Sequence, residues 1–585
     1  MPDTTFSELL RCLDPFVVSE ALDGTRGIEV TANIAKTTHI GHAVSEFGIR
    51  KIYLKLLEGV SAIAEHRLAA GRTLQLCDYN ILIRCAGAAS DIQAAKRFWS
   101  HAKEGKYSPW RASDLYTEYV KARFLTDPLY SQNDLGRFRV RARDLHRSQL
   151  KYDEEALERL DDLRVRITRR RTHRFGQNPE SQDYAEHIMR ILRNAKPVWT
   201  MFQNVNERAQ ATSEEFFCAA MIAFGRTGST EGIQYILRAA WQINLEIDPK
   251  TGEFDVGGGN IFPEDSLMRP TTRLLEAVTH SLCCQAEVSI ALHLVDFISR
   301  RYGLEIPRHV WSDLLEWTYI TATKPASLEW AIAGSPRKIL KPDAVMTVWD
   351  TMLAEPYNFK PGIKEYNLQV KTLIEMNRFH EAVNLMRSVK ATIYERLIQE
   401  QEEALFGATQ ALWQGVDCEA ALARYHRAHA KKAHAWSCLH SWCSKILHRV
   451  RTKRHDDPKL VRIVPDLVRE FWAFLPPVVQ YRTAAGVVRF RTDNADLRST
   501  SSPLHVDQAA IGFRPPNGTS PYGAYHSGEA RPDLSLQRWL QKMPRWVSHN
   551  RHRRKRFRRP LDLTYAPYTV AQAKISLRWL AQQYT

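Results

Sequence analysis

The sequence predicts an all-α protein: a solenoid of tandem helical hairpins, followed by a mostly irregular and basic C-terminal extension. Two segments share one pattern, "DYNILIRCAGAASDIQAAKRFW" from Asp78 and "EYNLQVKTLIEMNRFHEAVNLM" from Glu365. A third segment, residues 214–248, has the same 35-residue length as the unit at 76–110. Each two-helix unit leaves one apolar face uncovered, so such units stack on their neighbours into a superhelix.

The first unit follows an N-terminal helical region, residues 1–75, in which a helix is expected at 49–70. Within residues 76–110, apolar residues recur at helical spacing on either side of a break at 87–90. Pro109 ends this unit because proline cannot continue a helix.

The later units are copies of the same hairpin with insertions. In residues 214–248, Gly228 lies at the expected turn. A helical segment at 184–207 is expected to pack against the array. Weaker copies are expected at 111–145, 268–308 and 309–362, and a good copy at 363–397 with its break near Asn377. The repeats with their insertions are therefore predicted to cover residues 76–400.

The pattern changes after residue 400. Residues 401–455 are rich in Ala and predict a helical extension. In the C-terminal region, residues 456–585, alternation around Gly486 favours a β-hairpin. Residues 492–535 are rich in Ser, Pro, Gly and Asp and predict a linker ahead of a basic tail.

The composition favours a polyanionic partner in a reducing compartment. Among 585 residues, 82 Lys and Arg outnumber 65 Asp and Glu, which gives a formal net charge of +17 and a pI near 9.4. Nucleic acid is the simplest such partner, and an acidic membrane surface or a merely soluble basic protein are the alternatives. Nine Cys without a regular framework indicate free thiols. No run of about 18 apolar residues appears, so no membrane span is expected.

The N-terminus carries no targeting pattern. "MPDTTFSELLRCLDPF" has neither a secretory apolar region nor an Arg-rich, acid-poor presequence, since Asp3 and Glu8 precede Arg11. Taken alone it predicts a cytoplasmic protein. The alternative is that the sequence lacks its true start.

Three basic runs could bind phosphates through charge alone, without base specificity. They lie at 137–143, 164–174 and 551–559. A solvated face or a nuclear-localisation-like tract is the alternative for any single run. The tail residues predicted to bind RNA are Arg551, Arg553, Arg554, Lys555 and Arg556.

No motif indicates catalysis, a metal or a cofactor. His434 and Cys438 would share a helix face in "HRAHAKKAHAWSCLHSWC", but no paired CxxC or HExxH accompanies them. Buried thiols and exposed imidazoles are the better interpretation. We therefore expect a protein that is not an enzyme.

The units resemble the pentatricopeptide repeat (PPR), with Tyr-Asn at the start of helix one, an Ala and a bulky apolar pair in helix two, and a terminal Pro plus one residue. The resemblance implies binding of single-stranded RNA, one base per repeat, chiefly by the fifth residue of helix one and the last residue of the repeat. The fifth residues here are Asn80, Leu115, Cys218, Thr272, Asp313 and Asn367, and the last are Trp110, Asp248, Arg308 and Gly362.

Asn, Thr and Asp suit hydrogen bonds to the Watson-Crick edges of bases. Leu115, Cys218, Trp110 and Gly362 do not form the usual polar pairs, so no base sequence is decoded. The alternative for an Asn near a helix start is an N-cap or a local backbone partner.

A more particular resemblance is to fungal mitochondrial PPR proteins of the ATPase-expression type. It rests on "FSELLRCLDPF" near the start, on insert-bearing repeats and on the long C-terminal extension. It implies a mitochondrial protein that supports the stability or translation of an mRNA, typically that of an ATP synthase subunit. The implied partners are that mRNA and the mitochondrial ribosome or other expression factors.

The alternative from another class is a helical-repeat scaffold that assists assembly of a respiratory or ribosomal complex. Charge separates the two hypotheses. RNA binding needs positive charge along the concave surface, whereas a scaffold can keep its Arg clusters elsewhere.

Overall fold

The computed structural model describes 367 of the 585 residues, in segments. These are residues 2–22, 51–104, 113–131, 155, 159, 195–207, 213–248, 253–324, 326–332, 338–414, 419–452, 458–476, 478–483 and 486–492. The basic runs, residues 493–535 of the linker and Trp110 lie outside these described residues.

The N-terminal helices cover the first hairpin. Arg67 of the third helix pairs with Asp3 of the first, and its guanidinium lies 4.2 Å from the centre of the Phe6 ring. This contact holds the first helix against the third, because a guanidinium is attracted to the face of an aromatic ring. The helices are α1 (Asp3–Cys12), α2 (Pro15–Leu22) and α4 (Lys51–Ala69).

Four hairpins form the regular part of the array. Their helices are α5 (Leu76–Ala88) with α6 (Ile92–Glu104), α12 (Glu214–Thr227) with α13 (Thr230–Trp241), α14 (Thr272–Cys283) with α15 (Val288–Tyr302), and α19 (Ile363–Glu375) with α20 (Phe379–Val389). Each turn contains one residue with positive φ: Ser90, Gly228, Ala286 and Asn377. A left-handed residue at the helix end lets the chain reverse within a few residues. Three of these turns lie where the sequence predicted a break.

Two units are less regular. Helix α7 (Ser113–Phe124) is linked to α11 (Lys196–Glu207) by the Tyr116 hydroxyl, which donates to the Met201 carbonyl at 2.8 Å, and α11 packs against α12. A short helix, α8 (Pro128–Ser131), follows α7. The next irregular unit joins α16 (Arg308–Ala322), α17 (Ala326–Ile332) and α18 (Pro342–Leu353).

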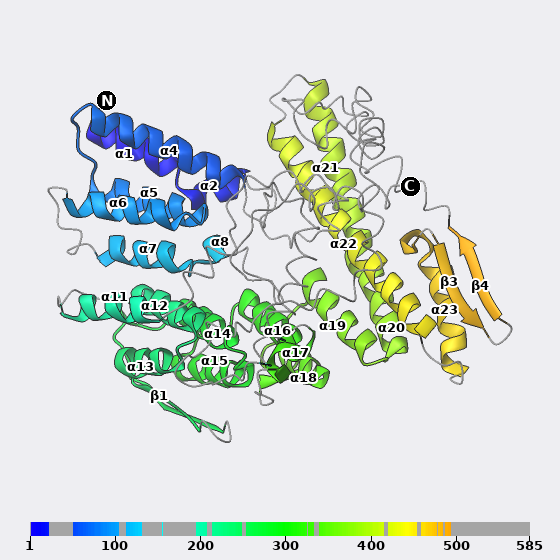
Figure 1. The fold of residues 1–585 in the computed structure, drawn as a ribbon. Helices are drawn as coiled ribbons and strands as arrows, with labels where there is room; N and C mark the ends of the chain where they lie inside the picture. The colour runs from blue at the N-terminus through cyan, green and yellow to red at the C-terminus, as the bar shows by residue number, and fades with distance from the viewer. Residues whose placement is uncertain are drawn as a thin grey trace.

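The first helices of successive units pack side by side and form what we call the inner row: α5, α7, α12, α14, α16 and α19. The second helices, among them α13, α15 and α18, lie on the outer side of the resulting curve (Figure 1). One continuous buried cluster runs from Phe6 to Leu368. The predicted all-α solenoid of helical hairpins is thereby confirmed.

A glycine sets the spacing of the inner row at its centre. A Cβ added to Gly225 of α12 would lie 2.3 Å from the Cα of Ser281 in α14. No side chain fits at that distance, so glycine is required for the two helices to approach this closely.

Two predicted boundaries are wrong. Residues 243–248 were included in the helical-hairpin unit 214–248, but β1 (Ile243–Ile247) pairs antiparallel with β2 (Phe254–Gly258). The reason is the alternation of "INLEI", in which Ile243 and Leu245 are buried while Asn244 and Glu246 are exposed. The unit expected from residue 268 begins its helix at Thr272, because Thr271 caps it by accepting from the Arg273 amide.

The C-terminal part continues the array. After a π-helical turn, Lys390–Tyr394, come α21 (Glu395–Trp413), α22 (Glu419–Thr452), α23 (Pro458–Glu470) and a 3-10 turn, Trp472–Phe474. The strands β3 (Val478–Thr483) and β4 (Gly486–Arg491) form the hairpin expected around Gly486. A second buried cluster joins α19 and α20 to the C-terminal half of α22, to α23 and to β3. Helix α22 also packs along α21.

Within the described segments, no helix combines the length and the apolar character needed to cross a membrane.

Candidate functional site

Asn80 is the predicted base-contacting residue whose environment fits that role best. It lies on α5 with its side chain partly exposed. Its amide oxygen is buried and has no hydrogen-bond partner within the described residues. An unpaired buried carbonyl costs about 1–3 kcal/mol, so a polar ligand that bonds this oxygen would recover that free energy.

Asn367, at the same position of the last hairpin, is not available to contact an RNA base. Its side chain is 6% exposed, and its amide oxygen accepts a hydrogen bond from the Trp442 indole at 2.8 Å. Helix α22 packs against α19 and brings Trp442 there. The prediction that Asn367 contacts RNA is therefore corrected: the side chain holds α22 in place.

Cys218 is also unavailable, because it is 1% exposed in the core of α12. Burial raises the pKa of its thiol well above the usual value. Leu115, another fifth position, is fully buried. Both lie in helices that have neighbours on either side in the inner row, and those neighbours cover them.

Asp248 and Thr272 fall outside the expected helical positions. Asp248 is exposed beyond the end of β1, and its amide donates to the Glu253 carbonyl at 2.8 Å. Thr272 is exposed but is the first residue of α14, so the fifth residue of that helix is Glu276. The shift follows from the later start of the helix.

Arg308 and Asp313 lie near one another on α16, and both face charged residues of α19. The Lys364 ammonium is 3.8 Å from the Asp313 carboxylate and 2.8 Å from that of Glu316. Burial raises the pKa of Asp313 to about 6, which Lys364 opposes. Arg308 is exposed, 3.9 Å from the Glu365 carboxylate.

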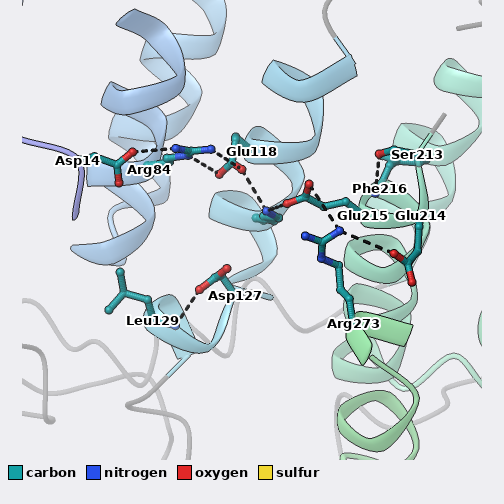
Figure 2. Close-up of polar contacts among 11 residues, drawn as sticks. Asp14, Arg84, Glu118, Asp127, Leu129, Ser213, Glu214, Glu215, Phe216 and Arg273 are labelled. Atoms are coloured by element: carbon teal, nitrogen blue, oxygen red, sulfur yellow. Dashed lines mark hydrogen bonds and ion pairs between the residues drawn. The ribbon is translucent and has the colours of Figure 1, made fainter. Parts of the chain in front are cut away.

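The inner row carries a chain of ion pairs that sequence reasoning missed. We call it the inner-row ladder, and its first part comprises Asp14, Arg84, Glu118, Lys121, Glu215, Glu214 and Arg273 (Figure 2). Arg84 lies 2.7 Å from Asp14 and 3.3 Å from Glu118, and Lys121 lies 3.0 Å from Glu118. Lys121 also pairs with Glu215 of α12, so the ladder links α5, α7, α12 and α14.

The ladder neutralises its cations. Burial alone would lower the pKa of Arg84, but Glu118 and Asp14 outweigh that effect and raise it. Burial would likewise raise the pKa of Glu215, and Lys121 and Arg273 lower it instead. The second part of the ladder joins α14, α16 and α19 through His309 with Glu276, at 2.6 Å, and through Lys364. Apart from Lys121 with Glu118, these pairs join side chains distant in sequence, so no local motif could have found the ladder.

The net positive charge is concentrated in the C-terminal part of the chain. The six inner-row helices hold eight basic and ten acidic residues. Residues 1–418 carry 52 basic and 54 acidic residues, whereas residues 419–585 carry 30 basic and 11 acidic ones. The positive excess of the protein therefore lies at its C-terminal end, beginning with α22, which has seven basic residues and one acidic residue.

The zinc alternative finds no support in the same helix. His434 and Cys438 are both buried, so the expected buried thiol is found but the expected exposed imidazole is wrong at His434. Burial lowers the pKa of His434 to about 4. The described segments contain no group of three or more side chains placed to hold a metal ion.

The tail residues from Arg551 to Arg556 and the runs at 137–143 and 164–174 lie outside the described residues, as does Trp110. Of the predicted base-contacting residues that are described, Asn80, Thr272, Arg308 and Asp313 keep exposed or partly exposed side chains on the inner row.

Comparison with known proteins gives one family and a set of solved structures. Residues 214–329, from α12 into α17, match the sequence model of the ATP13 family, described as mitochondrial ATPase expression. The resemblance to that family is thereby confirmed. No curated protein matches the chain.

Among solved structures, the pentatricopeptide repeat protein PPR10 from maize matches at 12% identity and a TM-score of 0.18, over 94% of this chain and 79% of that chain. PPR10 in complex with an 18-nt psaJ RNA element matches at 13% identity and the same TM-score, over 94% of this chain and 80% of that chain.

Proposed function

We propose that this protein binds single-stranded RNA in the mitochondrion and supports the expression of a transcript, with the mRNA of an ATP synthase subunit as the first candidate. The observation that carries the proposal is the match of residues 214–329 to a mitochondrial ATPase-expression family. The solenoid of PPR-like hairpins and the basic C-terminal end support it.

The proposed mechanism separates selectivity from affinity. Asn80 would bond a base edge, since its amide oxygen lacks a partner among the described residues. Thr272, Arg308 and Asp313 are proposed as weaker contacts, because ion pairs already engage the last two. Phosphate contacts would come from the basic C-terminal end, including residues 551–556. Steric protection of the RNA or its presentation to the ribosome needs no catalytic step.

In-cell ultraviolet crosslinking of the tagged protein, followed by sequencing of the bound RNA, tests this function. We expect enrichment of one mitochondrial transcript, reduced in Asn80→Ala. The matched control is Asn244→Ala, an exposed Asn on β1 at the outer side of the array. Diffuse crosslinks that neither substitution changes would contradict the proposal.

A protein scaffold is the second candidate function, and one observation favours it. The inner row is charge-balanced, so it lacks the positive surface that RNA binding along the row requires. Sedimentation of the tagged protein from mitochondrial extract separates the two candidates. Large complexes that survive ribonuclease indicate a scaffold, whereas complexes that dissolve with ribonuclease indicate RNA binding.

A further inference from the structure

Helix α22 extends the inner row by one member but differs from the others in its charges. It packs against α19, as α19 packs against α16. Its C-terminal half enters the second buried cluster through Leu439, Trp442 and Ile446. Its N-terminal half pairs with α21, where Leu422, Tyr425 and Ala428 meet Ala404 and Ala408. The backbone of the helix is therefore held in both halves, which fixes where its exposed side chains are attached.

Three cations lie on one exposed face beside that contact: Arg424, Arg427 and Lys431, which we call the α22 cation face. Their spacing of three and four residues puts them on the same side of the helix over about 10 Å. Among the described residues, none of the three makes a hydrogen bond or an ion pair. By contrast, carboxylates neutralise Arg84, Lys121 and Arg273 in the ladder.

We infer that the α22 cation face holds the phosphate backbone of a single-stranded RNA on the N-terminal half of α22, beside α21 and beyond the part of the helix that packs on the inner row. The inference rests on the proposed function and places its phosphate contacts. A pocket of about 390 Å³ between α21 and α22 is lined by all three cations, so they converge on a shared space. Guanidinium and ammonium groups are the usual phosphate partners, and unpaired ones lose no existing ion pair on binding.

Two carboxylates, Glu400 and Glu403 of α21, line the same pocket and oppose a phosphate there. Glu400 is 3.5 Å from Arg396, which neutralises it in part. These carboxylates should weaken the binding of RNA phosphates. Substituting them therefore provides a second test, in which RNA binding is expected to become tighter. Their removal should tighten RNA binding if the backbone passes through this pocket, and should leave it unchanged if RNA lies elsewhere.

The experiment measures binding of a labelled single-stranded RNA oligonucleotide of mixed sequence to the full chain across a salt series. The test variant is Arg424→Gln, Arg427→Gln, Lys431→Gln. The matched control is Lys96→Gln, Arg97→Gln, Arg238→Gln, three exposed cations of the outer helices α6 and α13. Thermal unfolding checks that all variants fold.

Loss of three phosphate contacts should reduce the slope of log K against log salt by about 2, and weaken binding on the order of 100-fold at 50 mM salt. The control should match the wild-type protein. Glu400→Gln, Glu403→Gln should tighten binding several-fold. A test variant that retains the wild-type slope overturns the inference while the proposed function stands. A wild-type protein that binds no RNA overturns both.

Discussion

The first and last regular hairpins carry the same motif in different surroundings. Asn80 and Asn367 follow the same Tyr at the start of the first helix of their hairpins. Asn80 is partly exposed and its amide oxygen has no partner among the described residues, whereas Asn367 is buried and bonded to Trp442. The difference shows that the role of a repeat position depends on what covers it. Here α22 converts a candidate base contact into a structural bond.

Removal of the Trp442 side chain, which covers Asn367, is expected to cause the largest loss of stability. Trp442 is fully buried, and Trp442→Ala should destabilise the junction of α19 with α22 by about 3–5 kcal/mol, because it leaves a cavity and an unpaired Asn367. Native-state hydrogen exchange should show faster exchange in α19 and α22 with α5 unchanged. Trp442→Phe keeps most of the ring volume and should lose less. Equal loss in α5 would contradict a local role.

The second largest loss of stability is expected at acid pH, in α22 where it packs on the last hairpin. Burial, aided by Lys371, lowers the pKa of His434 to about 4 from an ordinary 6.5. The unfolded chain binds the proton more readily, so this stability is present above pH 6.5 and is lost as the pH falls towards 4. The expected loss is about 2 kcal/mol at pH 5.

The measurement is the pH dependence of native-state hydrogen exchange in α22, compared between the wild-type protein and His434→Gln. That variant should flatten the dependence between pH 6.5 and 4. At the other end of the array, Asp127 has the opposite pH dependence. Burial raises its pKa to about 6, so the stability that it contributes is lost as the pH rises. An unaltered pH profile in His434→Gln would show that another group titrates.

Asn367→Ala isolates the hydrogen bond itself. It should cost about 1–3 kcal/mol at the same junction, because the buried Trp442 indole N–H loses its acceptor. Exchange protection of α19 is the readout. A neutral result would mean that packing alone holds α22, and the contrast between the two hairpins would lose its physical basis.

The solenoid could be predicted from sequence because its signals are local. Helical spacing and the breaks at Gly228 and Asn377 lie within each 35-residue unit. The site could not, because Trp442 bonds an Asn 75 residues away and Lys121 pairs with Glu215 across an insertion. The spacing of Arg424, Arg427 and Lys431 was visible in the sequence, but only the fold shows that they have no ion-pair or hydrogen-bond partner among the described residues.

Asn80→Ala should have the smallest effect on stability, within about 0.5 kcal/mol or slightly stabilising, since it removes a buried oxygen that has no partner among the described residues. The same substitution should reduce selectivity among RNA sequences, because one base contact of about 1–3 kcal/mol is lost. Competition binding between two RNA sequences measures that ratio, and exchange in α5 measures stability. Asn367→Ala should show the reverse pattern: lost protection with unchanged selectivity. If Asn80→Ala is destabilised while its selectivity is unaltered, then Asn80 and Asn367 both have structural roles. The inner row would then have no base contact at either position.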